Sequence, residues 1–304
     1  MDLVLRDKVK IGISMCCYGA KVRYNSKGWN LVENLGREKS NFIWYPVCPE
    51  CMAGLGVPRN PIKIVGKSGM EAIEGTAKVK SSGGENVTEK LVNASKVCLD
   101  TLKSAGVYIY IYKEGSPSCG VYRTTLKNKR LGKPPGVFGA MLLKEDFLLI
   151  SADDLESPIK RWDIRRRIHA YVWVKEYQIN SKSELYDLFH SVKFLVQEID
   201  EVAARKIGRE IANAGKIDSE YVEKFKKEVL NIIRKPSELK KIKGWMFKNY
   251  SYYRKRGLIN YEIKMEPRAI SGSTKLANEI MKVEKELFKA GYSFGSSPIL
   301  YRGR

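Results

Sequence analysis

The chain has 304 residues, 43% of them hydrophobic and 29% charged, and a formal net charge of +21 at neutral pH. Six cysteines are too few for a disulfide scaffold, no apolar run approaches the roughly 20 residues of a membrane span, and the first residues form no basic-then-apolar signal segment. We therefore expect a cytoplasmic protein with reduced thiols and no membrane partner, long enough for two domains of about 150 residues each.

The excess of basic residues concerns the partners of the protein more than its fold. There are 55 lysines and arginines against 34 acidic residues, and both halves of the chain are basic. A polyanionic partner, most simply nucleic acid, is the interpretation we favour. The alternative is a cationic protein adapted to a hot or salt-rich cytoplasm.

Three β-branched and aromatic runs, typical of strands, each lead to a cysteine. The runs are residues 10–14, 42–47 and 107–112, and the cysteines that follow them are Cys16, Cys48 and Cys119. If the runs pair as a parallel sheet, all three thiols project from its carboxyl edge, where open α/β sheets place their ligands. The pattern suggests a metal or cluster site with one coordination position left open.

Between these strands the pattern is that of a parallel α/β domain. Apolar residues from Val87 to Ala105 recur at helical spacing, Gly106 ends the helix, and the strand 107–112 follows directly. Residues 147–151 form a last strand. We predict a Rossmann-like α/β domain over residues 1–155, with residues 152–158 as a linker.

After the linker the pattern changes to long helical periods with few strand signals. One helix is predicted around residues 185–199, a second from Asp218 to before Pro236, a third over 237–256 and a fourth over about 274–290. The second domain, residues 159–304, is therefore predicted to be all-α.

Two basic clusters in this second domain suit contacts with phosphates and bases. In the first, lysines and arginines of residues 240–256 alternate with aromatic side chains; in the second, Arg165, Arg166 and Arg167 are consecutive. The alternative is an ordinary helix with aromatic residues in the core and lysines in water. Of the two histidines, His190 is expected to be structural, and two histidines cannot make a histidine-rich metal site.

The remaining candidate residues surround the three cysteines. Glu50, two residues after Cys48, can activate water as a general base, or it is a surface carboxylate near a helix N-terminus. Ser116 and Ser118, just before Cys119, either hydrogen-bond a substrate or shape the turn. Cys98 lies on the apolar face of the predicted helix, so we expect it in the core.

These cysteine motifs resemble those of the thiouracil desulfidase family. The matching strings are Ser14-Met15-Cys16 with Gly19 and Val22-Arg23-Tyr24, then Pro46-Val47-Cys48-Pro49-Glu50 with Gly54-Leu55 and Pro58-Arg59, then Lys113-Glu114-Gly115-Ser116-Pro117-Ser118-Cys119-Gly120. The resemblance implies a 4Fe-4S cluster held by Cys16, Cys48 and Cys119, with the fourth iron open. It also implies catalytic roles for Glu50 and for Ser116.

The family has apolar residues where this chain has Cys17 and Cys51, and we expect neither to be an essential ligand. The second half resembles a helical domain fused to this family, in residues 188–193, 252–257 and 290–301. Fused proteins of this kind resemble desulfidases of 4-thiouridine in tRNA. The alternatives are a desulfidase of free thiouracil or thiouridine, and a non-catalytic iron–sulfur protein that binds nucleic acid.

Overall fold

The computed structural model describes residues 3–125, 132–258 and 272–302. The chain divides into two compact units. Lys8–Glu156 form one, here the α/β unit, and Met1–Asp7 with Ser157–Arg304 form the other, here the helical unit. The sequence boundary was drawn at residues 155–159; the first seven residues, which it assigned to the α/β domain, belong to the helical unit.

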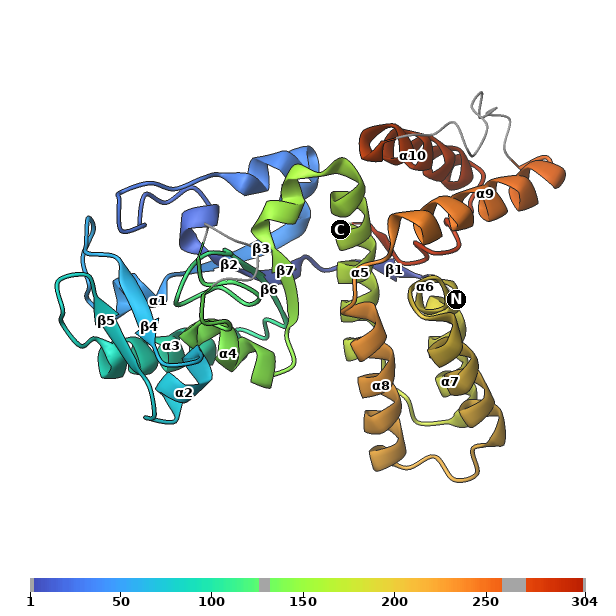
Figure 1. Ribbon diagram of the computed structural model, residues 1–304. Coiled ribbons are helices and arrows are strands. Elements are labelled where there is room, and N and C mark those ends of the chain that lie inside the picture. The colour runs from blue at the N-terminus through green and yellow to red at the C-terminus, as the bar shows by residue number, and fades with distance from the viewer. Residues whose placement is uncertain (1–2, 126–131, 259–271, 303–304) are drawn as a thin grey trace. The chain divides into compact units, whose positions relative to one another are not determined.

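A parallel sheet of four strands forms the centre of the α/β unit (Figure 1). The strands are β2 (Val9–Ser14), β3 (Phe42–Val47), β6 (Ile109–Tyr112) and β7 (Leu148–Ser151), in the spatial order β3-β2-β6-β7. β2 and β3 pair over all six residues, from Val9 opposite Phe42 to Ser14 opposite Val47. The predicted parallel sheet is thereby confirmed. Its strand order reverses between β2 and β6, where open α/β sheets leave a ligand crevice.

The hydrophobic core lies between this sheet and its helices. The predicted helix is confirmed as α3 (Thr88–Ser104), and Gly106 after it has a φ of +70°, which suits a helix end. The core contains Cys98, as predicted, together with Tyr110 on β6. Gly12 on β2 leaves room for the Tyr110 ring, because a Cβ at this position would lie 2.6 Å from that ring.

Several short elements of this unit were not predicted. They are the antiparallel hairpin β4 (Ile62–Val65) and β5 (Lys78–Ser81), the helices α1 (Pro49–Met52), α2 (Gly69–Ile73) and α4 (Val137–Lys144), and the 3-10 helices η1 (Met15–Cys17) and η2 (Leu31–Asn41). Elements of four or five residues are too short to give a clear period.

Residues 152–158, predicted as a linker, begin as a packed 3-10 helix, η3 (Ala152–Glu156). Ala152 and Leu155 are fully buried, and the carboxylate of Asp153 forms ion pairs with Lys113 and Arg123 from the loop after β6. Asp153, one of the acidic residues of the predicted linker, therefore binds basic partners within the α/β unit.

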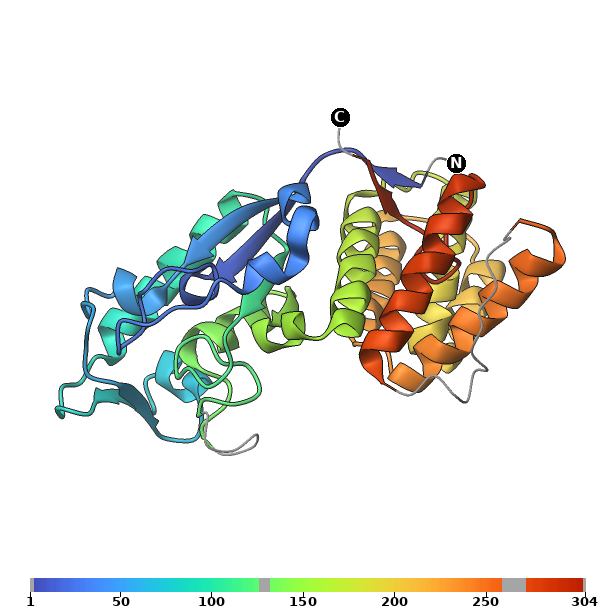
Figure 2. The same cartoon turned by 90° about the horizontal axis from the view of Figure 1, so that it is seen from above.

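Six helices make up most of the helical unit, the yellow-green to red part of Figures 1 and 2. They are α5 (Pro158–Glu176), α6 (Lys182–Ile199), α7 (Glu201–Asn213), α8 (Ser219–Ile233), α9 (Leu239–Lys255) and α10 (Ser273–Lys289). The four predicted helices correspond to α6, α8, α9 and α10. Asp218 caps α8 by accepting a hydrogen bond of 2.9 Å from the Tyr221 backbone.

The helical unit also contains one short parallel strand pair, which an all-α prediction does not include. β1 (Val4–Leu5) pairs with β8 (Leu300–Tyr301), and this pairing explains why the first residues group with the helices. Among the described residues, none of the helices combines the length and the hydropathy that a membrane span requires.

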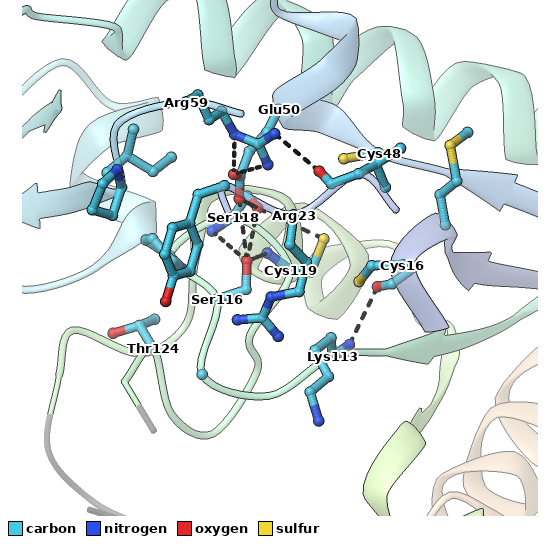
Figure 3. Close-up of a pocket in the computed structure, with 18 of the residues that line it drawn as sticks. Cys16, Arg23, Cys48, Glu50, Arg59, Lys113, Ser116, Ser118, Cys119 and Thr124 are labelled. Carbon is cyan, nitrogen blue, oxygen red and sulfur yellow. Dashed lines mark hydrogen bonds and ion pairs between the residues drawn. The ribbon is translucent and has the colours of Figure 1, made fainter. Parts of the chain in front are cut away.

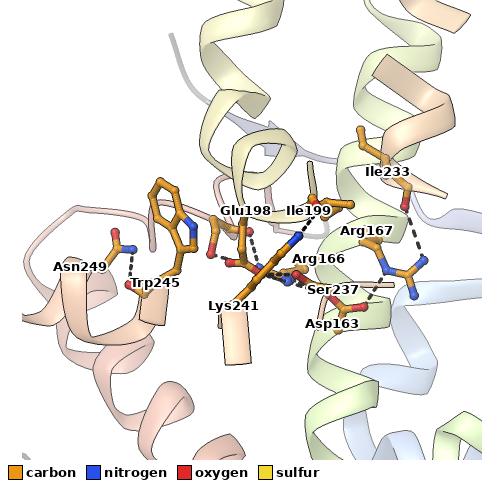
Figure 4. Close-up of polar contacts among 11 residues, drawn as sticks. Asp163, Arg166, Arg167, Glu198, Ile199, Ile233, Ser237, Lys241, Trp245 and Asn249 are labelled. Atoms are coloured by element: carbon orange, nitrogen blue, oxygen red, sulfur yellow. Dashed lines mark hydrogen bonds and ion pairs between the residues drawn. The ribbon is translucent and has the colours of Figure 1, made fainter. Parts of the chain in front are cut away.

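The predicted phosphate-binding cluster on α5 is wrong. Arg166 is 1% exposed and pairs with Asp163 at 2.7 Å and Glu198 at 2.5 Å (Figure 4). Arg167 is also buried and pairs with Asp163 at 2.7 Å, while Arg165 pairs with a carboxylate of α10. Because α5 packs against both α8 and α10, its arginines face other helices and carry structural ion pairs.

Candidate active site

The candidate site is a cavity of about 460 Å³ in the α/β unit (Figure 3). Cys16, Cys48 and Cys119 all line it, and so do Glu50 and the two serines before Cys119. The first two cysteines follow β2 and β3 directly, and the third lies in the loop after β6. The three strands are neighbours in the sheet, so their carboxyl ends bring together residues that are distant in sequence.

Two short elements present the first two thiols. Cys16 is the middle residue of η1, one turn that begins as soon as β2 ends. Cys48 immediately precedes α1, whose first residue is Pro49, a residue that favours the first position of a helix. Glu50 follows in the first turn of α1, so the same turn places a thiol and a carboxylate at the cavity wall.

The start of α4 fixes the loop that carries Cys119. The backbone N–H groups of Val137 and Phe138 donate to the carbonyls of Pro117 and Ser118 at 3.1 and 2.9 Å. Gly136 allows this approach, because a Cβ there would lie 2.6 Å from the Pro117 oxygen. The third thiol is therefore held by backbone hydrogen bonds rather than by its own side chain.

Glu50 lies at the centre of a hydrogen-bonded network. Its Oε2 accepts from Arg59 Nε at 2.9 Å and Nη2 at 2.5 Å, a two-point ion pair in which both side chains are largely buried. Its Oε1 accepts from Ser118 Oγ at 2.6 Å and from Ser116 Oγ at 3.4 Å. Arg59 thus fixes the orientation of the carboxylate, and the other oxygen meets the serines.

The two serines have different partners. Ser116 Oγ accepts hydrogen bonds from the backbone N–H groups of Ser118 at 3.3 Å and Cys119 at 3.1 Å, which shapes the turn. Ser118 Oγ makes the shorter bond to Glu50 and lies 3.7 Å from Cys119 Sγ. The geometry therefore links Ser118 more directly to the carboxylate, and Ser116 more directly to the loop.

The three thiols are electrostatically coupled through Cys119. The contact with Cys17 and burial raise the pKa of the Cys16 thiol far above its usual range. Burial and the nearby Cys119 raise the pKa of Cys48, and burial with the nearby Cys16 raises the pKa of Cys119 to about 12. Burial and mutual repulsion therefore oppose ionisation of all three thiols unless a cationic group lies beside them.

The donor set at this cavity consists of three thiols. Among the described residues, no group of three or more His, Cys, Asp or Glu side chains is arranged to hold one metal ion. Thiolates are the usual ligands of iron–sulfur clusters, in which each thiolate binds its own iron, so the residue types present are compatible with such a group.

The other cysteines stay away from the cavity wall. Cys17 is fully buried, with its Sγ 4.0 Å from Cys16 Sγ, and Cys51 Sγ lies 3.8 Å from the Val22 carbonyl oxygen. Neither lines the cavity.

The cavity is also lined by three basic residues that the sequence pattern did not mark as functional: Arg23, Arg59 and Lys113. Arg23 Nη1 is buried without a hydrogen-bond partner among the described residues, and its guanidinium carbon lies 4.6 Å from the centre of the Trp29 ring. Lys113 Nζ lies 5.1 Å from the same ring. Arg23 and Arg59 belong to the motifs already quoted, so their place beside the motif cysteines and Glu50 was the available signal.

The α/β unit is the part of the chain that a known protein family matches. The sequence profile of the 2-thiouracil desulfurase family matches residues 11–154. An uncharacterized protein of Bacillus subtilis (strain 168), YbbK, is 32% identical over 150 residues, which are 48% of this chain and 97% of that protein.

A solved structure described as a [4Fe-4S]-dependent thiouracil desulfidase, TudS, is 28% identical over 49% of this chain and 94% of its own, with a TM-score of 0.39. The residues matched by the profile lie within the α/β unit and span its three cysteine motifs. Through this unit, the chain belongs to the 2-thiouracil desulfurase family.

Proposed function

We propose that the protein is an iron–sulfur-dependent desulfidase that removes the sulfur of 4-thiouridine in tRNA by hydrolysis without redox change. One observation carries the proposal: three thiols, a carboxylate and a hydroxyl line one cavity within a unit of the desulfurase family. A pure iron–sulfur binding protein, the alternative from another class, has no need of the Glu50–Ser118 pair beside its cysteines.

Cys16, Cys48 and Cys119 would hold a 4Fe-4S cluster. When bound, the cluster supplies an open iron as a Lewis acid for the soft thione sulfur. The proposal uses these three cysteines as ligands because, within the described part of the chain, Cys17 and Cys51 do not line the cavity.

Glu50 acts as the general base in this proposal. Its Oε1 accepts a proton from the water that adds to C4 of the thiouracil ring, while Arg59 keeps the carboxylate in place through Oε2. Ser118 Oγ, 2.6 Å from Oε1, passes or holds the proton. A carbon–oxygen bond forms, the carbon–sulfur bond breaks, and the sulfur leaves as hydrogen sulfide, so no oxidant or reductant is needed.

Arg23 provides a donor for the rest of the substrate. Its buried Nη1 has no partner among the described residues, and such a group favours a ligand acceptor such as a ring carbonyl or a phosphate oxygen. Tyr24 and Trp29, each 39% exposed, lie next to this guanidinium and offer surfaces on which a base can stack.

The choice of tRNA over a free base rests on the charge of the chain and on its helical unit. Net charge of +21 favours a polyanion, and α9 carries exposed lysines and arginines around Tyr252. A desulfidase of free thiouracil or thiouridine remains the second candidate, since a cavity of about 460 Å³ admits a pyrimidine without any RNA.

The test is an anaerobic preparation with iron and sulfide quantified, given 4-thiouridine-containing tRNA and free 4-thiouracil in competition. We expect sulfide release, with tRNA preferred. Glu50→Gln should keep the visible absorbance of the cluster and lose about 10²- to 10⁴-fold in turnover, because the amide cannot accept the proton.

Glu74→Gln is the matched control, an exposed residue of the same unit that does not line the cavity. Wild-type turnover in Glu50→Gln would remove the general-base assignment. Absence of sulfide release from both substrates by the iron-loaded wild type would favour the non-catalytic alternative.

A further inference from the structure

The helical unit contains a groove that the sequence analysis did not single out. It has a volume of about 740 Å³ and lies between α6 and α7. The two helices form a tight hairpin in which Asp200 ends α6 and caps α7, its Oδ1 accepting from the Ala203 backbone at 3.0 Å. The short connection holds the two walls of the groove in a fixed position.

Each wall is one stripe of a helix. Tyr186, His190 and Lys193 follow at spacings of four and three residues on α6, and Arg205 and Arg209 are four residues apart on α7. Residues at these spacings lie on the same face of a helix. The cations and aromatic rings therefore face one shared space.

The charge of this groove has one sign. Within the described part of the chain, its lining includes Lys193, Arg205 and Arg209 but no aspartate or glutamate. Among the described residues, neither Lys193 nor Arg209 has a carboxylate partner. Arg205 pairs with Glu201 at 2.6 Å, but both side chains are exposed, and such solvent-exposed pairs are weak. The groove thus offers three cations to a ligand.

The groove also offers flat surfaces. The rings of Tyr186 and His190 stack with centres 6.1 Å apart and planes inclined by 22°. Phe189 of α6 and Gly208 of α7 also line the groove, and a Cβ on Gly208 would lie 3.6 Å from the Phe189 ring. Cations that bind phosphates beside rings that stack on bases form the combination by which proteins hold single-stranded RNA.

We infer that the α6–α7 groove binds an RNA segment of the substrate, with Lys193, Arg205 and Arg209 on phosphates and the Tyr186–His190 pair under a base. The inference rests on the proposed function, which names tRNA as the partner. It assigns binding to this groove rather than to α5, whose arginines are buried in ion pairs, or to α9 alone, where Tyr250 belongs to the core.

The test uses the full-length protein and fluorescently labelled tRNA, with affinity measured by anisotropy at several salt concentrations. Lys193→Glu combined with Arg209→Glu should weaken binding about tenfold or more near physiological salt, and the slope of log affinity against log salt should become shallower by about 1 to 2. Tyr186→Ala should weaken binding about fivefold to a hundredfold while leaving the slope unchanged.

The matched control is Lys275→Glu combined with Lys285→Glu on α10, two exposed lysines with the same change in net charge. An equal loss of affinity in the groove variant and the control would overturn the inference, since it would show a general field effect. Tight binding of an acidic peptide with no binding of tRNA would overturn it as well.

Desulfuration of free 4-thiouracil separates this inference from the proposed function. Groove variants that lose tRNA affinity but turn over the free base at the wild-type rate support both. A wild-type protein that binds tRNA through the groove yet releases no sulfide from either substrate would leave the groove in place and remove the desulfidase.

Discussion

Two arginine–carboxylate pairs, one in each unit, use the same chemistry for different ends. In the α/β unit, Arg59 binds one oxygen of Glu50, and the other oxygen meets Ser118 at the wall of the cavity. In the helical unit, Arg166 binds both oxygens of Glu198, at 2.5 and 3.0 Å, inside the core. The two pairs differ in what the second carboxylate oxygen contacts: a serine at the cavity wall for Glu50, and the same arginine for Glu198.

The ion pair between Arg166 and Glu198, here called the closed pair, leaves no carboxylate oxygen for a ligand. Asp163 accepts from Arg166 through Oδ1 and from Arg167 through Oδ2, and Ser237 donates to Glu198 at 2.6 Å (Figure 4). Such networks hold a core together only while every member has its partner. The ion pair between Arg59 and Glu50, here called the open pair, by contrast holds the carboxylate in place and leaves its Oε1 available for chemistry. Of these two pairs, the one with a carboxylate oxygen at the cavity wall is therefore the candidate for a role in catalysis.

The largest effect should come from the open site. Cys119→Ala removes one of the three thiols, and we expect iron content and turnover to fall to background while the fold remains, because the loop is held by backbone hydrogen bonds from α4. Iron quantification and circular dichroism measure the two outcomes. Cys98→Ala is the control: it removes a core sulfur, and it should keep its iron and lose only stability. Iron retained in Cys119→Ala would break the comparison at the cysteine site.

The closed pair should respond in the opposite way. Arg166→Met leaves Glu198 buried without a cationic partner, while Asp163 keeps its pair with Arg167, and we expect a loss of about 3 to 5 kcal/mol in the free energy of unfolding. Urea unfolding of the iron-loaded protein measures it. Arg165→Met, on the same helix but partly exposed, should cost about 1 kcal/mol or less. If Arg166→Met kept its stability and lost turnover, the closed network would have a functional role that its geometry does not indicate.

A further buried residue of the helical unit, His169, makes the stability of the protein depend on pH. Burial and the nearby Arg165 lower the pKa of His169 to about 4, and its Nε2 has no hydrogen-bond partner among the described residues. Unfolded, this histidine would titrate near 6.5.

The contribution of neutral His169 to stability is therefore complete above about pH 6.5 and is lost as pH falls through about 4, a total of about 3 kcal/mol. Stability curves of the wild type and His169→Gln at pH 7 and pH 4.5 measure this contribution. The difference between the two pH values should be smaller in the variant. Equal pH dependence in both proteins would mean that His169 has the same pKa in the folded and the unfolded protein.

The sequence was sufficient to predict that the three cysteines lie together, because the topology of the sheet brings them to one edge. Strand-like runs before Cys16, Cys48 and Cys119 were visible, and parallel strands that are neighbours bring their carboxyl ends to one edge. It was not sufficient for Arg59 and Arg23, since nothing in a loop sequence says which way a guanidinium turns. Nor did it separate Ser116 from Ser118, because hydrogen bonds to the turn backbone decide their roles.

For the helical unit, the number and position of most helices followed from apolar periodicity, but the use of charge did not. Arg165, Arg166 and Arg167 were predicted to meet phosphates, yet three consecutive residues of a helix point in different directions. α5 has helices on more than one side, so two of the three are buried. The α6–α7 groove escaped notice for the same reason, since its charges come from two helices and only the hairpin brings them together.

The smallest effect should mark the border of the open site. Cys51 lies three residues after Cys48, a spacing often found in metal sites, but its thiol contacts the Val22 carbonyl and does not line the cavity. Serine preserves the size and can donate to the same carbonyl, so Cys51→Ser should hold as much iron as the wild type and turn over substrate at the same rate. Cys48→Ser, the paired variant, should lose both. If Cys51→Ser lost iron while remaining folded, the thiol would have to reach the cluster by a rearrangement of α1. The bound cluster, rather than the wall of the cavity, would then determine which cysteines are ligands.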